Sequence, residues 1–240
     1  MSEAEQPPRS APALVDPDLA RRGVRHGFGV RGSAEPEGCL RPRQVHGATV
    51  VSAAACGPRQ RAPEADAIVA TTRGVVVGVV TADCVPILLV AAQGAGVAAV
   101  HAGWRGLTRG VVGAGVLELA RASGATPEGI AAAIGPHIGA CCYEVDAPVL
   151  DAIATRLGPE ALASSTPVRA GHWLLDLGAL AALALVRAGV PQLAIGSAAA
   201  RCTACDPERF HSHRRDGPAA GRLVHFVEVP GPFRGGRREA

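Results

Sequence analysis

Residues 75–92, VVVGVVTADCVPILLVAA, place a short Thr-Ala-Asp-Cys segment between two runs of β-branched and aliphatic side chains. Apolar runs of this length are typical of buried strands, so we expect strands over 75–80 and 87–92. Because Pro86 cannot donate a hydrogen bond to a sheet, we also expect a bulge or turn beside Cys84. The stretch thus predicts a sheet-based core with a thiol at a break between two buried strands.

Strands and helices alternate further along the chain. The patterns predict strands over 96–100, 130–134, 192–197 and 223–229, a helix over 107–121 that stops at Gly124, a helix capped by Asp146, and a helix over 177–188 that begins at Asp176 and is closed by Gly189. This order predicts a mixed-sheet sandwich of the α/β or α+β class. Residues 1–20 and 231–240 are rich in Pro, Gly and charge, so we expect mobile tails around one domain over 21–230.

Composition excludes several functions. All 24 basic residues are Arg, so Schiff-base chemistry, pyridoxal phosphate anchoring and a Lys-containing phosphate loop are unavailable. An anionic substrate must be held by Arg or by backbone amides. A net charge of +3 without a long basic run argues against a nucleic-acid partner. No segment reaches the roughly 18–20 apolar residues of a membrane span, and we expect no membrane partner.

The seven cysteines are an odd number without the spacing of a disulfide framework, and residues 1–20 lack a signal-like apolar core, so we expect a cytoplasmic protein. Cys202 and Cys205 form a lone CxxC, a weak signal for redox or zinc chemistry. We find no second pair to complete a four-thiolate site, and interpret Cys202 as packing and Cys205 as incidental. The adjacent Cys141 and Cys142 have no clear chemical interpretation.

Three potential metal ligands stand in short segments flanked by apolar or Gly residues: His46, Cys84 and His101. Two imidazoles and one thiolate with a vacant fourth position are the pattern of a catalytic zinc site. Each residue alone has an ordinary alternative, since an isolated Cys or His in an apolar segment is usually part of the core. The separations of 38 and 17 residues (84 − 46 and 101 − 84) fit no compact zinc finger.

Other side chains suggest roles around such a site. Asp83 is an acid in an apolar run and therefore needs a partner. Arg105 follows a predicted strand and begins a helix, where it would meet an anion or, equally, only cap the turn against Trp104. His211-Ser212-His213 alternates imidazoles as some copper sites do, or forms a solvated charged loop with the residues that follow.

Seven segments in a fixed order carry a resemblance that none carries alone. They are Gln44-Val45-His46-Gly47, Thr81-Ala82-Asp83-Cys84-Val85-Pro86, His101-Ala102-Gly103-Trp104-Arg105-Gly106, Ile134-Gly135-Pro136, Cys142-Tyr143-Glu144-Val145, Cys202-Thr203 and Ser212-His213-Arg214-Arg215-Asp216. Over roughly residues 24–229 the chain resembles the bacterial laccase-domain family, also called the YfiH or peptidoglycan-editing-factor family.

The resemblance implies an αββα sandwich and a zinc site at His46, Cys84 and His101. It implies phosphorolysis of adenosine, inosine and methylthioadenosine, adenosine deamination, and a link to editing of peptidoglycan precursors. It also places Arg31 at a family arginine. Members usually carry a Ser-Leu-Asn-Leu-Gly stretch and an Asn-Arg helix before the Gln-Val-His segment, whereas only residues 32–43 stand there in this chain. We therefore expect one wall of the substrate pocket to be missing or rebuilt.

The leading hypothesis is zinc-assisted chemistry on a nucleoside, with Asp83 as a base or an orienting group and Arg31 or Arg105 holding phosphate. The alternatives are a copper-dependent phenol oxidase, a cell-wall editing amidase, and a non-catalytic partner protein in which the metal only stabilises the structure. Two His and one Cys also suit copper, but blue-copper sites commonly add an axial Met, and the single Met is Met1. Oligomeric state is not predicted.

Overall fold

The computed structural model describes residues 10–57 and 61–231, which contain a central six-stranded sheet. Its strands lie in the order β11-β7-β5-β6-β3-β2. Their bounds are β2 Val50–Ser52, β3 Ala67–Ala70, β5 Val85–Ala91, β6 Val97–Ala102, β7 Ile130–Ile134 and β11 Ile195–Gly196. The β2–β3 and β11–β7 pairs are parallel and the others antiparallel, so the sheet is mixed, as predicted.

Two smaller antiparallel sheets complete the architecture. One has the order β1-β12-β4, with β1 His26–Phe28, β4 Val76–Thr81 and β12 Leu223–Glu228. The other has the order β8-β10-β9, with β8 Glu144–Asp146, β9 Ser165–Arg169 and β10 His172–Leu175. The chain leaves the small sheet at the end of β4 and enters the central sheet at β5. The predicted break beside Cys84 is therefore a crossing between two sheets.

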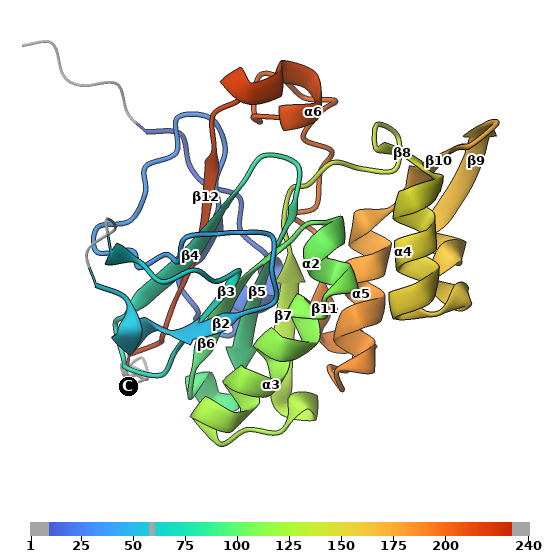
Figure 1. The fold of residues 1–240 in the computed structure, drawn as a ribbon. Helices are drawn as coiled ribbons and strands as arrows, with labels where there is room; N and C mark the ends of the chain where they lie inside the picture. Colours follow the sequence, from blue (N-terminus) through green and yellow to red (C-terminus); the bar gives the residue numbers. More distant parts are fainter. Residues whose placement is uncertain (1–9, 58–60, 232–240) are drawn as a thin grey trace, which may run out of the picture.

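The helices lie mainly on one side of the central sheet (Figure 1). They are α2 Trp104–Thr108, α3 Val111–Ser123, α4 Ala147–Leu157 and α5 Leu177–Arg187, with the short α1 Pro17–Arg21 and α6 His213–Asp216 elsewhere. One apolar core fills the space between these helices and the sheet, and a second lies between the central sheet and the β1-β12-β4 sheet. The single-domain α+β sandwich with mixed sheets is thus confirmed. None of the helices in the described ranges combines the length and apolar character needed to cross a membrane.

Several local predictions are corrected. The helix expected over 107–121 is two helices, because Gly110 adopts φ 83° between α2 and α3. Residues 192–197 form a 3-10 turn and the two-residue β11 instead of a full strand. β5 begins at Val85 and includes Pro86, whose carbonyl still accepts a hydrogen bond from Gly135.

The mobile tail predicted over 1–20 is wrong for residues 10–20. Leu14 pairs with Phe28, Asp16 caps α1, and Leu19 is fully buried in the second core. The polar composition of this segment does not predict its packing, because one apolar residue every few positions is enough to hold a short segment against the core. Residues 1–9, and all of the predicted tail 231–240 except Gly231, lie outside the described residues.

Two glycines of α3 differ in what surrounds them, and this difference gives a stability test. A Cβ at the buried Gly115 would lie 2.8 Å from Cγ2 of Val100 in the central sheet, whereas at Gly113 it would meet nothing within 4 Å. We expect Gly115→Ala to destabilise the protein by about 1–2 kcal/mol through overpacking. Gly113→Ala, its matched control, should stabilise the fold by about 0.5–1 kcal/mol through helix propensity. Denaturant unfolding measures both, and equal effects would contradict this packing.

Candidate metal centre

Three segments deliver the predicted ligands to one place. Cys84 lies in the bend between β4 and β5, His101 is the next-to-last residue of β6, and His46 lies in the loop that precedes β2. In the β5–β6 register Val85 pairs with Ala102, so Cys84 stands opposite Gly103. A Cβ at Gly103 would lie only 2.9 Å from Sγ of Cys84. Glycine at this position therefore makes room for the thiol.

The donor atoms of His46, Cys84 and His101 all lie within 4.8 Å of one another. Sγ of Cys84 is 3.9 Å from Nε2 of His46, and the two imidazole rings stand edge to face with centroids 4.8 Å apart. Bonds of about 2.0–2.3 Å from each donor to a single ion fit these separations. The structure thus brings together the three residues that the sequence suggested, in a geometry suited to a metal ion.

A buried carboxylate that the sequence analysis missed, Asp66, organises this group. Its Oδ1 accepts a hydrogen bond of 2.8 Å from Nδ1 of His101, which leaves Nε2 of that ring for the site. Its two oxygens also accept backbone N–H bonds from Val45, His46 and Gly47. A carboxylate behind a ligating imidazole fixes its tautomer and raises its basicity. Asp66 thus orients one ligand directly and the loop of a second.

The charges of the group support one another. Burial alone would raise the pKa of Cys84, but hydrogen bonds first from His101 and then from His46 outweigh it and lower that pKa to about 6. Burial would likewise lower the pKa of His101, but bonds to Asp66 and Cys84 raise it to about 9. Cys84 is therefore a thiolate at neutral pH, the form that binds metals.

Two non-glycine residues at the site have positive φ: His46 at 57° and Asp83 at 91°. Such conformations cost about 1–3 kcal/mol and persist only when surrounding contacts enforce them. Asp66 holds His46. Asp83 is held by Thr203, whose hydroxyl donates to Oδ1 at 2.6 Å, and by the backbone N–H of Arg214, which donates to Oδ2 at 2.6 Å. Because both carboxylate oxygens are engaged, the position of Asp83 favours the orienting role over the base.

The ligands line a cavity of about 630 Å³. Its wall also contains Asp83, the aromatic rings of Trp104 and Tyr143, and the arginines Arg105, Arg214 and Arg222. Arg105 stacks on Trp104 with its guanidinium carbon 4.6 Å from the ring centroid, and Arg214 lies 4.9 Å from that of Tyr143. Pro42 and Gln44 complete one side, so the shortened segment before Gln44 still contributes to the wall. Cationic and aromatic groups therefore surround the three ligands.

Arg31 does not lie where the family resemblance suggested. It is absent from the cavity lining, and its guanidinium is bonded to the Phe210 carbonyl and to the carboxylate of Asp216. The phosphate-binding role expected for Arg31 therefore finds no support in its position. His213 lines the cavity, but neither it nor His211 belongs to a group of three or more metal-ligating side chains in the described residues.

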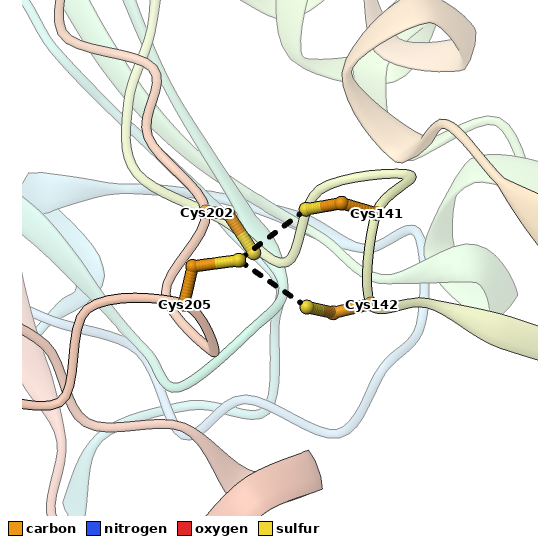
Figure 2. A group of neighbouring side chains, drawn as sticks. All are labelled: Cys141, Cys142, Cys202 and Cys205. Atoms are coloured by element: carbon orange, nitrogen blue, oxygen red, sulfur yellow. Dashed lines mark hydrogen bonds between the residues drawn. The ribbon is translucent and has the colours of Figure 1, made fainter.

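The cysteines outside this centre correct a second expectation. Cys141, Cys142, Cys202 and Cys205 meet in space, with donor atoms all within 4.8 Å of one another (Figure 2). The lone CxxC does have a second pair, which the sequence supplies about 60 residues earlier as adjacent cysteines. Cys202 packs against the first apolar core, as interpreted, but Cys205 is not incidental, because its sulfur faces those of Cys141 and Cys142.

Residues missed at the sequence level fall into two groups. Asp66 carried a usable signal, because it is an acid directly before an apolar run that forms β3. Tyr143 and Arg214 stand in two segments of the family resemblance but show no local pattern, and Arg222 has no signal at all. The fold brings them to the cavity from the loop before β8, from α6 and from the loop before β12.

The role of Asp66 predicts a loss of metal affinity on Asp66→Asn. An amide cannot accept from both His101 and the 45–47 loop as the carboxylate does, so we expect about 10- to 100-fold weaker binding. Competition with a chromophoric chelator, at a temperature where the variant is folded, measures this. The exposed Asp151→Asn is the matched control and should bind as the wild type does. Unchanged affinity in Asp66→Asn would contradict the orienting role.

The lowered pKa of Cys84 gives a pH test on the metal-free protein. The rate of alkylation of Cys84, followed by peptide mass mapping, should increase with pH because the thiolate is the reacting form. The midpoint of this increase should lie near pH 6. His101→Ala should move that midpoint upward, since it removes the hydrogen bond that lowers the pKa most. A midpoint for Cys84 in the wild type as high as the ordinary thiol value would show that the imidazoles do not stabilise the thiolate.

Comparison with known proteins places this geometry in a family. A protein of Xylella fastidiosa named purine nucleoside phosphorylase is 42% identical over 177 residues, which are 72% of this chain and 66% of that protein. A protein of an unknown prokaryotic organism, named adenosine deaminase RL5, is 40% identical over 158 residues, 65% of this chain and 59% of that protein. The matches thus span less than two thirds of the length of each of these two relatives.

The fold has solved counterparts. The crystal structure of a Bacillus licheniformis protein described as hypothetical protein YfiH superposes with a TM-score of 0.81 at 25% identity, covering 91% of this chain and 97% of that one. A family model described as multi-copper polyphenol oxidoreductase laccase matches residues 22–230. The chain therefore belongs to this laccase-domain family.

Proposed function

We propose that this chain is a zinc-dependent enzyme of purine nucleosides, which performs phosphorolysis of adenosine, inosine and methylthioadenosine and deamination of adenosine. The observation that carries the proposal is the cavity: His46, Cys84 and His101 line it together with aromatic and arginine side chains. A volume of about 630 Å³ is within the range of small-molecule sites. The names of the relatives from Xylella fastidiosa and the unknown prokaryote support these two reactions.

Zinc suits the donor set better than the copper cluster that the family description suggests. Two imidazoles and one thiolate leave one position of a tetrahedral ion open for a reactant. A multi-copper oxidase needs further imidazole groups, whereas the only other candidate group in the described residues consists of four cysteines. The donor set thus fits a single zinc ion, which would be held by His46, Cys84 and His101. When bound, such an ion supplies a Lewis acid for activating water or polarising a substrate atom.

The protein's own groups provide binding and orientation. Trp104 and Tyr143 offer ring faces for a purine base, and Arg105 and Arg214 lie against those same rings. In phosphorolysis the bond from the ribose carbon to the purine nitrogen breaks and a bond to a phosphate oxygen forms. The arginines would neutralise the incoming phosphate through charge-assisted hydrogen bonds. In deamination, water replaces the amino group of adenosine and ammonia leaves.

Asp83 contributes by holding the wall together. Its carboxylate connects the β4–β5 bend to the loop that carries Thr203 and to Arg214 of α6. Arg214 in turn donates to the carbonyl of Glu144 at 3.0 Å, next to Tyr143. These bonds would fix the distance between Cys84 and Arg214, and so help to position the nucleoside and the phosphate. The proposed location is the cytoplasm, since the seven cysteines lack the spacing of a disulfide framework.

A product assay tests the proposed activity. Zinc-loaded protein is incubated with adenosine, inosine or methylthioadenosine, with and without phosphate, and the products are separated by chromatography. We expect phosphate-dependent release of free purine base and phosphate-independent formation of inosine from adenosine. His101→Ala, purified in the same way, should lose both activities and so exclude a contaminant. Absence of both in the wild type, with turnover of a peptidoglycan precursor or a phenol instead, would overturn the proposal in favour of the amidase or oxidase alternative.

Arg105→Ala tests the phosphate role. Loss of a charge-assisted contact should raise KM for phosphate about 10- to 100-fold and leave the metal content unchanged. Arg121→Ala, on the exposed face of α3 where it pairs with Glu118, is the matched control and should leave KM unaltered. Arg31→Ala tests the family-based expectation directly. An increase in KM for Arg31→Ala equal to that for Arg105→Ala would refute the assignment from the cavity.

A further inference from the structure

Four cysteines from two loops form a compact group separate from the three ligands of the candidate metal centre. Cys141 and Cys142 lie in the loop between β7 and β8, and Cys202 and Cys205 lie between β11 and α6. Figure 2 shows the four side chains pointing toward one another. Sγ of Cys205 is 3.5 Å from Sγ of Cys141 and 3.4 Å from Sγ of Cys142, and all four sulfur atoms lie within 4.8 Å of one another.

We propose that these four thiols bind one zinc ion as a second, structural metal site. Four Zn–S bonds of about 2.3 Å at the tetrahedral angle place the sulfur atoms about 3.8 Å apart, close to the separations observed. The group is too small for a cluster of several irons, and four thiolates without an imidazole or an open position are the set of a structural zinc.

The backbone around the thiols is arranged for such a site. The N–H groups of Cys142 and Tyr143 both donate to the carbonyl of Gly139, which makes a tight turn that presents two consecutive cysteines. The second loop is docked beside it, because His137 donates to Arg201 and Thr203 donates to His137 through the backbone. Both pairs of ligands are therefore held in place by bonds that need no metal.

Gly139 adds two further features. Its N–H donates to Sγ of Cys202 at 3.3 Å, a contact that stabilises a thiolate and is the kind of outer hydrogen bond that supports metal-bound ligands. A Cβ at Gly139 would lie 3.4 Å from Sγ of Cys141 and 3.6 Å from that of Cys202. Glycine thus provides both a donor and the space for two of the sulfurs.

The arrangement favours a metal over a disulfide. Cys205 faces Cys141 and Cys142 at nearly equal distances, so no single partner is selected for an S–S bond of about 2.05 Å. A tetrahedral ion satisfies all four thiols at once.

The consequence of the second zinc is a stiffened cavity wall. Tyr143 follows Cys142 directly, and Thr203, which holds Asp83, lies between Cys202 and Cys205. Arg215 donates to the carbonyls of Thr203 and Ala204 in the same loop. An ion joining the two loops would therefore fix the residues that position Tyr143 and Asp83, although it touches neither.

Metal analysis of the full chain, purified under reducing conditions with zinc and without chelator, tests the site. We expect about two zinc ions per chain in the wild type and about one in both Cys205→Ser and His46→Ala. Cys205 is exposed, so its replacement does not disturb the core. The half-buried Cys56, distant from both groups in sequence and free, gives the matched control Cys56→Ser, which should retain the wild-type content.

Unchanged zinc in Cys205→Ser would overturn the proposal, as would iron in place of zinc or a protein mass showing a disulfide. Loss of zinc in Cys205→Ser but not in His46→Ala would uphold this site and contradict the proposed catalytic metal. A second measurement needs no variant: thiol labelling with mass mapping should find Cys141, Cys142, Cys202 and Cys205 protected until a chelator is added. Equal labelling of these four before and after the chelator would also refute the site.

Discussion

The buried carboxylate of Asp66 is the constraint on which the candidate centre depends. It accepts from the ring of His101 and from three successive backbone N–H groups of the loop that carries His46. The backbone N–H of His101 also donates to the carbonyl of Asp66 at 2.8 Å. One residue directly before β3 thus ties the loop that carries His46 to the end of β6. A fully buried charge is tolerated only with such complete pairing.

The second constraint is the crossing of the chain from the small sheet to the central sheet at residues 82–84. It puts Cys84 opposite the end of β6. Asp83 has a positive φ there, which hydrogen bonds with three partners stabilise. Those partners are Ile138 and Thr203, which lie in the two loops that hold the four cysteines, and Arg214 of α6. Hydrogen bonds of Asp83 thus link the bend that carries Cys84 to the two loops that carry the four cysteines.

The sequence predicted best what depends on local pattern. The strands around residues 75–92, the strand that ends near His101, and the helix that begins at Asp176 follow from apolar runs and caps, and they carry two of the three ligands. The convergence of His46 with these residues was suggested by the donor set and by family resemblance, since spacing alone cannot show it. Short strands such as β1, β8 and β10 lacked a signal because tertiary pairing, more than side-chain pattern, creates them.

The errors share a physical cause. Arg31 was placed by family position, but its guanidinium has closer partners in Phe210 and Asp216, which fold beside it from the far end of the chain. The CxxC of Cys202 and Cys205 lacks a second pair nearby in sequence, because the partners of Cys205 are 63 and 64 residues away. Contacts between distant loops are invisible to periodicity, and functional sites are built largely from such contacts.

Anomalous diffraction at the zinc absorption edge, from crystals of zinc-loaded protein, would locate an ion held by the two imidazoles and the thiolate. We expect a peak bounded by Sγ of Cys84 and the imidazole nitrogens of His46 and His101, with Nδ1 of His101 still bonded to Asp66. Zinc-saturated crystals with no anomalous density among these three side chains would contradict it.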